Sequence, residues 1–166
     1  YNDSLDCVKE NIKGSFKDKI DIGVNILLLH TEIQGSKTPT GFVFEDGIKS
    51  KWLSKHFDWT FCGHVHKYQK FQPNVFNIGS PLHHDWGDKG DKKGFLVLDT
   101  DSKSVERVTT SYPEFREIEE IDICIHKNDS TNFYKIKFDD GVSDLDIKQI
   151  KKDIPFSILD YKVKTK

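Results

Sequence analysis

The chain has 166 residues, of which 36% are hydrophobic and 31% are charged, and its formal net charge is −2. This is enough apolar material for the core of one ordinary domain or one and a half small ones, which argues against disorder. The longest aliphatic run, 26–29, is far shorter than the ~20 residues of a membrane-spanning helix. The charge balance lacks the excess of Lys and Arg usual in a nucleic-acid-binding domain. We therefore expect a chain without a membrane partner.

Other features of the composition bear on where the protein works. Cys7, Cys62 and Cys124 are widely spaced and form no CxxC pair, so they predict neither a disulfide framework nor a cysteine zinc site. This favours a reducing compartment, the cytoplasm. The chain has no methionine and begins at Tyr1, from which we expect a piece of a larger protein. A lysine-rich, alanine-free composition indicates an AT-rich coding sequence of phage or low-GC bacterial origin.

In the first two thirds of the chain, the apolar pattern switches between helical and strand periods. A continuous apolar run ending at His30 is typical of a strand covered on both faces of a sheet. Gly, Pro, Asn and Asp residues interrupt the pattern and mark the connecting loops. The predicted elements are a helix within 3–20, a strand over 24–30, a helix over 47–56, strands over 57–62 and 75–78, and a hairpin of 95–99 with 105–110.

The pattern changes near Pro113, and we place a domain boundary at 112–117. Beyond it the sequence predicts strands over 118–125, 133–138 and 158–163 and a helix over 143–152. Ser143 is expected to cap this helix because its hydroxyl can accept a hydrogen bond from the first turn. Acidic residues in that turn also complement the helix dipole. The expected result is a small β-β-α-β unit.

Five of the seven histidines lie at predicted strand ends or in the loops just after them, where open α/β sheets form their sites. In an extended chain, His64 and His66 would face one cavity because they are two residues apart. His30 ends a separate strand, and parallel strands ending side by side would bring it to the same place. Three neutral imidazoles suit zinc, manganese or iron rather than an all-protein magnesium or calcium cage. An isolated His-x-His pair is equally compatible with a surface pair.

Four segments resemble calcineurin-like metallophosphoesterases: the strand ending at His30, FCGHVHKYQ at 61–69, NIGSP at 77–81 and KGF at 93–95. GHxH marks the superfamily. The glutamine three residues after the second histidine, the GSP turn and the KGF strand are similar to its SbcD-like branch, the nuclease subunit of DNA double-strand-break repair complexes. The resemblance covers about 24–113 and extends more loosely over 114–166.

The resemblance implies an α/β fold: the second half of a four-layer α/β metallophosphoesterase sandwich at 1–113, followed by a small α+β accessory unit at 114–166. It also implies two divalent metal ions, manganese above all, with zinc, iron or magnesium as alternatives. His30 and His64 correspond to ligands of one metal and His66 to a ligand of the other. Two such metals clamp the scissile phosphate and generate a hydroxide nucleophile.

The family's other ligands lie in DxH, GDxxD and GNH motifs that precede this region. DxH and GNH do not occur here, and the GDxxD match at 87–91 follows GHVH instead of preceding it. We therefore expect the chain alone to bind metal weakly and to catalyse nothing. Candidate contacts to the substrate phosphate are Lys67, Ser80, His83 and His84. Lysines of the 67–93 region would line a DNA path or belong to a solvated loop, and the alternatives for Lys148, Lys151 and Lys152 are phosphate contacts or a solvated helix face.

The leading hypothesis is a manganese-dependent DNA exonuclease or endonuclease subunit. Its expected partners are DNA, an SbcC-like SMC-type ATPase and, in the full-length protein, a second copy. The first alternative is another calcineurin-like enzyme acting on a small phosphodiester or a phosphoprotein. The second is a non-catalytic interaction module with the same fold, against which the presence of all three ligand-type histidines argues.

Overall fold

The computed structural model describes residues 2–15, 23–119, 122–126, 129–138, 141–153 and 158–163. The chain divides into two compact units, one of Tyr1–Ser80 with Lys93–Thr109 and one of Pro81–Lys92 with Thr110–Lys166. The predicted boundary at 112–117 assigned 81–92 to the first unit, whereas in the structure this segment belongs to the second. This segment belongs there because the ring of Trp86 packs edge-on against Phe115, with centroids 5.0 Å apart.

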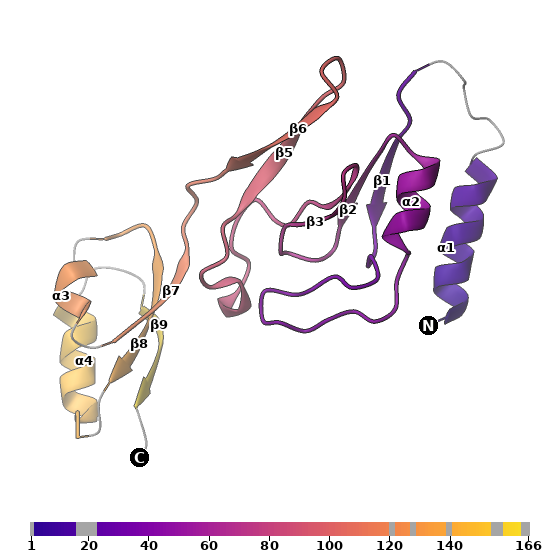
Figure 1. The fold of residues 1–166 in the computed structure, drawn as a ribbon. Coiled ribbons are helices and arrows are strands. Elements are labelled where there is room, and N and C mark those ends of the chain that lie inside the picture. Colours follow the sequence, from indigo (N-terminus) through magenta and orange to yellow (C-terminus); the bar gives the residue numbers. More distant parts are fainter. Residues whose placement is uncertain are drawn as a thin grey trace. The chain divides into compact units, whose positions relative to one another are not determined.

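A four-stranded sheet in the order β1-β2-β4-β3 forms the centre of the first unit. β1 (Ile26–His30), β2 (Trp59–Gly63) and β4 (Val75–Asn77) run parallel, and β3 (Gln69–Gln72) joins antiparallel at the edge (Figure 1). The three parallel strands confirm the strands predicted from the apolar runs, whereas β3 was not predicted. β1 and β2 end together, with His30 opposite Gly63.

Two helices, α1 (Asn2–Ser15) and α2 (Ser50–His56), contribute to the core of this unit (Figure 1). Both were predicted, and the continuation of the first helix beyond 15 lies outside the described residues. Leu27 and Leu29 of β1 pack against this core. Its buried members are Ile12, Ile33, Ile48, Leu53, Cys62 and Val75.

The opposite face of β1 is open. Ile26 and Leu28 are 44% and 73% exposed, alternating with the residues that face the core. The prediction of a strand covered on both faces is therefore wrong for the described chain. The same face continues onto Phe61, which lies opposite Leu28 and stacks on Phe76 with ring centroids 5.7 Å apart.

A hairpin of β5 (Gly94–Asp99) and β6 (Ser104–Thr109) completes the first unit, and it confirms the predicted hairpin. Its turn is closed by the Asp99 carboxylate, whose Oδ1 accepts the backbone N–H groups of Asp101 at 2.9 Å and Ser102 at 3.0 Å. These bonds hold the pKa of Asp99 below its usual range because they favour the ionised form.

The second unit is a parallel three-stranded sheet with helices. Its strands β7 (Phe115–Glu119), β8 (Phe133–Phe138) and β9 (Ile158–Val163) lie in chain order. Every second side chain of β8 packs in a core that it shares with α4 (Asp144–Asp153). The helical elements are η2 (Trp86–Asp88), α3 (Ile123–His126) and α4 (Asp144–Asp153) (Figure 1), and the buried core is Ile118, Tyr134, Ile136, Phe138 and Ile147.

Sequence and structure agree at the start of α4 and differ before α3. Ser143 Oγ accepts the Asp146 N–H at 3.2 Å, while the Asp146 carboxylate accepts the Ser143 N–H and O–H, which is a reciprocal cap. The strand predicted over 118–125 is wrong, since β7 ends at Glu119 and α3 follows. Ile125, an apolar member of that pattern, is 75% exposed.

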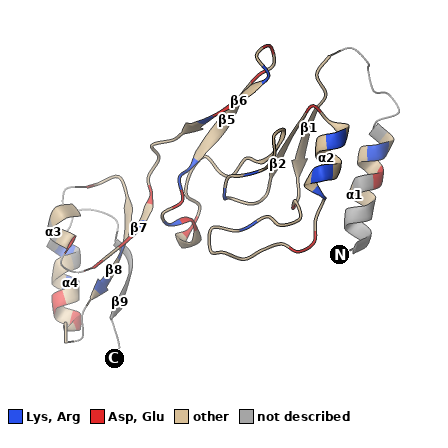
Figure 2. Ribbon diagram, viewed as in Figure 1, with Lys and Arg blue, Asp and Glu red and all other residues tan. Residues whose placement is uncertain are grey.

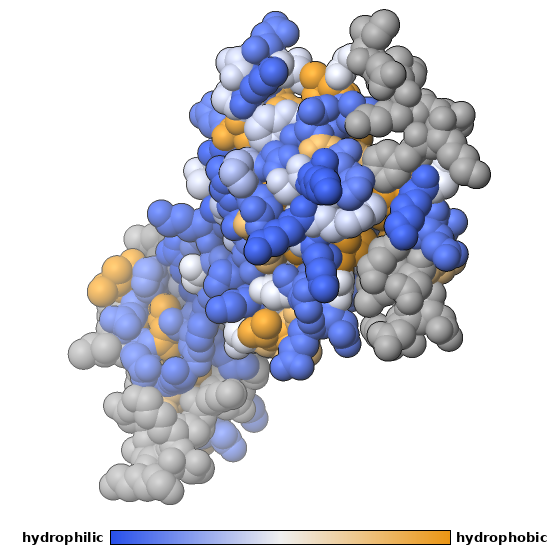
Figure 3. Space-filling view, turned by 45° about the vertical axis from the view of Figure 1, so that its right-hand side comes forward, coloured by the Kyte–Doolittle hydropathy of each residue, from blue (hydrophilic) through white to orange (hydrophobic). Residues whose placement is uncertain are grey.

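Charges of both signs are interspersed along the ribbons of each unit (Figure 2), and hydrophilic residues dominate the face shown in Figure 3. Lys148 and Lys152 of α4 are exposed, and the side chain of Lys151 lies outside the described part. Within the described residues, no helix has the length and apolar character needed to cross a membrane.

Candidate metal centre

The carboxyl ends of β1 and β2 bring two of the predicted histidines together. His30 is the last residue of β1, and His64 directly follows β2. The two residues are neighbours because the strands are parallel, with His30 opposite Gly63. Their rings meet edge to face, with centroids 5.4 Å apart and an interplanar angle of 84°. Both residues are exposed to solvent. The pair also lies at the carboxyl ends of parallel strands, which is where ligand sites form in open α/β sheets.

The path of the chain at GHVH differs from the predicted extended geometry. His64 adopts a φ of 89°, a left-handed value that non-glycine residues rarely take, and 64–67 form a bend outside any strand. Gly63 supplies space rather than a turn, since a Cβ there would lie 3.0 Å from His30 Cδ2. The alternation rule that would place His64 and His66 on one side therefore does not apply to this loop.

A carboxylate joins the histidine pair. Glu32 Oε1 lies 3.1 Å from His64 Nε2, and the Glu32 side chain is only 22% exposed. Its backbone is fixed by the Ile48 N–H, which donates to the Glu32 carbonyl at 3.1 Å. Glu32 is thus held against His64, and sequence reasoning missed it although it lies two residues beyond His30.

Cys62 lies beside these residues but is not a ligand in this state. Its side chain is buried, and the Sγ donates to the Thr31 carbonyl at 2.9 Å. Burial raises the pKa of this thiol to about 11, since an uncompensated thiolate is costly away from water. The thiol is therefore protonated at neutral pH and serves as a small hydrogen-bonded core group.

Imidazole and carboxylate groups are the donors that zinc, manganese and iron accept, so His30, His64 and Glu32 are of a suitable type. His66 is half-buried in the same loop. Among the described residues, however, no group of three or more His, Cys, Asp or Glu is arranged to hold a metal ion. The histidine pair alone cannot fill the four positions of even a tetrahedral site.

His83, a candidate phosphate contact, is buried in the second unit, and both of its ring nitrogens bond to the backbone. It is 7% exposed, its Nδ1 accepts the Phe115 N–H at 3.2 Å, and its Nε2 lies 2.9 Å from the Asp91 carbonyl. Because Nδ1 accepts, the ring N–H that faces the Asp91 carbonyl is the one on Nε2. His84 is exposed, and its backbone N–H donates to Asp88 Oδ2 at 2.8 Å.

The other phosphate candidates lie in or against the His64–His66 loop. Ser80 is 5% exposed, and its hydroxyl and backbone N–H both point to the His66 carbonyl. Lys67 is half-buried and its carbonyl accepts a bond from Asn77. Lys93 is 4% exposed and donates to the His66 carbonyl at 3.1 Å, so the solvated-loop interpretation is wrong for this lysine.

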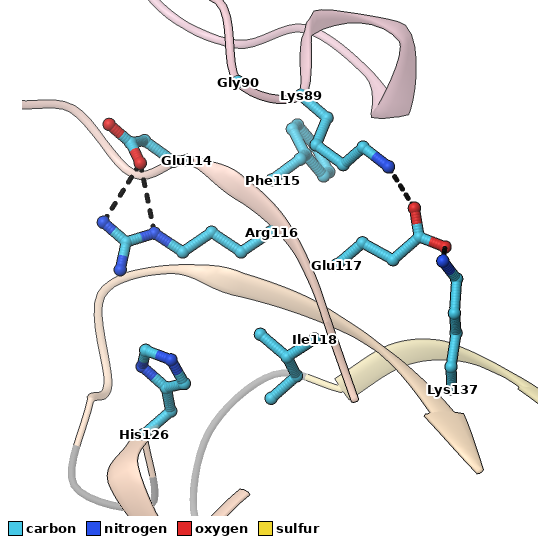
Figure 4. A pocket seen from close by; sticks show the side chains of 9 residues that line it. All are labelled: Lys89, Gly90, Glu114, Phe115, Arg116, Glu117, Ile118, His126 and Lys137. Atoms are coloured by element: carbon cyan, nitrogen blue, oxygen red, sulfur yellow. Dashed lines mark hydrogen bonds and ion pairs between the residues drawn. The ribbon is translucent and has the colours of Figure 1, made fainter. Parts of the chain in front are cut away.

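The second unit holds a pocket of about 360 Å³ lined by residues of β7, β8 and the 89–90 turn (Figure 4). Arg116 faces Glu114, with Nη2 and Oε2 3.0 Å apart. Glu117 bridges two lysines, Lys89 and Lys137, the latter with Nζ 2.9 Å from Oε1. Together these lysines lower the pKa of Glu117 to about 2.

These pairings decide what the pocket can hold. The carboxylates of Glu114 and Glu117 already face its three lysine and arginine side chains. A phosphate entering the pocket would have to displace a carboxylate from its cation. The pocket is therefore not arranged as an anion site, and it gives no support for DNA contact at this surface.

The fold is mixed α/β, and the histidine pair lies at the carboxyl ends of two neighbouring parallel strands, β1 and β2. No protein-family model matches the chain, and no curated protein matches it.

Proposed function

We propose that the chain is part of a two-metal phosphodiesterase, a DNA exonuclease or endonuclease subunit of the SbcD-like kind, and is inactive by itself. In this proposal, residues 1–113 are the carboxyl-terminal half of the metallophosphoesterase domain. One observation carries the proposal: the parallel register of β1 and β2 places the His30 and His64 rings 5.4 Å apart at the sheet edge. These are the two histidines that the motif resemblance assigns to a single metal.

In this proposal, His30 and His64 would hold and orient a manganese ion, which when bound would supply Lewis acidity for phosphodiester hydrolysis. Glu32 would fix the ring of His64 through the imidazole N–H, as carboxylates do behind many metal-binding histidines. The bridging carboxylate and the remaining ligands would come from the motifs that precede this region in the family.

The exposed outer side chains of β1 also support the proposal. β1 is one of the two edge strands of the described sheet, and Ile26 and Leu28 project from it into solvent. In a sandwich, a second sheet would cover these side chains. DNA, an SMC-type ATPase and a second copy of the full-length protein are the proposed partners, by the same resemblance.

The metal assignment can be tested on the chain itself. Titration with Zn²⁺, a diamagnetic substitute for manganese, should shift the imidazole ¹⁵N signals of His30 and His64 in NMR spectra. His83 is an internal control, because its ring nitrogens already bond Asp91 and Phe115. His64→Ala should remove the response of His30. Because two histidines form only a weak site, the titration is carried to a large excess of Zn²⁺. His30 and His64 signals that stay unshifted there would contradict the proposed metal site.

The nuclease assignment needs the protein that carries both halves. There, His64→Ala should abolish manganese-stimulated DNA cleavage while largely sparing DNA binding, because phosphate contacts elsewhere carry most of the affinity. The measurement is cleavage of labelled duplex beside a gel-shift titration at fixed salt. Cleavage unchanged in this variant would remove His64 from the mechanism, and metal binding without DNA cleavage would favour a phosphoesterase with a smaller substrate.

A further inference from the structure

The loop that carries His64 and His66 is held by its carbonyl groups. Three successive carbonyls, those of Val65, His66 and Lys67, accept hydrogen bonds from residues far along the chain. This loop lies outside the strands, and His64 within it has a φ of 89°. A strained conformation persists only where its surroundings fix it, so these contacts matter to the position of the histidines.

Asn77, the last residue of β4, makes two of these bonds. Its Nδ2 donates at 2.6 Å to the Val65 carbonyl and at 2.6 Å to the Lys67 carbonyl. The residue is 1% exposed, so water cannot replace its amide protons if they are lost. One side chain thus fixes the carbonyls on both sides of His66.

The His66 carbonyl between them accepts from two residues. The Ser80 N–H donates at 3.0 Å and the buried Lys93 ammonium at 3.1 Å. Gly79 allows the approach, because a Cβ there would lie 3.0 Å from the His66 oxygen and 2.8 Å from the Tyr68 nitrogen. The NIGSP and KGF segments therefore converge on the backbone of the histidine loop.

We propose that Asn77, together with Ser80 and Lys93, is a positioning residue that sets the histidine loop for metal binding. Asn77 touches no reacting atom and acts through the backbone of 65–67. The inference rests on the proposed function for its metal, whereas the ordering of the loop by Asn77 can be measured without any metal.

The chain contains a matched control at the other end of the same strand. Asn74, just before β4, donates through Nδ2 to two carbonyls, Ser54 at 3.2 Å and Phe57 at 2.9 Å. Asn74→Ala removes the same pair of donated bonds as Asn77→Ala, together with the bond that Asn74 Oδ1 accepts from the Ser54 hydroxyl at 2.6 Å. None of these bonds goes to the histidine loop. A difference between the two variants is therefore specific to that loop.

The experiment compares four ¹⁵N-labelled forms of the 166-residue chain: the native sequence and the variants Asn77→Ala, Asn77→Ser and Asn74→Ala. Backbone ¹⁵N relaxation of 64–67 measures loop order, and Zn²⁺ titration measures affinity at His30 and His64. Asn77→Ala should loosen 64–67 and weaken Zn²⁺ binding about 10- to 100-fold, the usual cost of losing a supporting contact. Asn77→Ser keeps one donor, so it should be intermediate and serves if Asn77→Ala does not fold.

Asn74→Ala should leave both readouts at their native values. Equal loop order in the native chain and the Asn77 variants, or equal loosening in Asn74→Ala, would overturn the proposal. A native chain whose histidines ignore Zn²⁺ would instead refute the proposed function, and the relaxation data would still decide whether Asn77 orders the loop.

Discussion

Gly94→Ala should lower the free energy of unfolding by about 3 kcal/mol, because overpacking against backbone leaves little room for relaxation. Gly94 begins β5 opposite Thr109, and an added Cβ would run into the carbonyl oxygen of Val108. The Gly94 N–H also donates to Ser80 at 3.2 Å, so the clash would disturb the residue that contacts the His66 carbonyl. Urea denaturation followed by circular dichroism measures the loss.

The same substitution at Gly14 is the control. Gly14 lies within α1. Apart from the helix's own backbone, no atom of the described residues lies within 4 Å of the Cβ that alanine would add. Gly14→Ala should therefore stabilise the protein by about 0.5–1 kcal/mol, as replacing glycine in a helix generally does. Gly94→Ala with native stability would show that the two strands can separate enough to admit a methyl group at no cost.

Ile136→Ala should destabilise the second unit by about 2–5 kcal/mol, the usual cost of truncating a buried isoleucine. Ile136 is fully buried between Tyr134 and Phe138 on the core side of β8. Its loss would leave a cavity among side chains that the sheet and α4 hold apart. Trp86 fluorescence reports on this unit because the indole packs against Phe115, provided that Trp52 and Trp59 are replaced by phenylalanine.

Leu145→Ala is the matched control in the same unit. Leu145 is 77% exposed on α4, so its truncation should change the free energy of unfolding by less than about 0.5 kcal/mol. A similar loss in both variants would contradict the assignment of Ile136 to the core and of Leu145 to the surface.

The best sequence predictions concern elements whose signals are local. β8 was predicted at its observed bounds from the apolar residues of 133–138. In the structure, every second residue of this strand is buried. The start of α4 followed from Ser143 and the acidic first turn. The His30 and His64 pair was reached by combining two apolar runs with the rule that parallel strands end together.

The errors arose where the same local signal fits two structures. The isoleucines at 121, 123 and 125 alternate like those of a strand, yet β7 ends at Glu119 and Ile125 is exposed in α3. Alternation at His64–His66 likewise assumed an extended chain, and the φ of 89° at His64 breaks it.

The contacts of Glu32, Asn77 and Lys93 are tertiary. Lys93 is 27 residues from the carbonyl that it contacts, and no periodicity in a single sequence pairs residues across such a distance. The Lys89 ion pair with Glu117 spans a similar separation. A resemblance can mark the segments NIGSP and KGF, but only the folded backbone shows that both meet the histidine loop.

The open face of β1 has a practical consequence for work with the chain. Ile26 and Leu28 form part of an apolar edge strand with no charge or proline to discourage intermolecular pairing, which is the usual origin of aggregation in sheet proteins. Hydrophobic association weakens on cooling. Purification and spectroscopy are therefore best carried out cold and dilute, and coexpression with any segment that covers this face should raise the soluble yield.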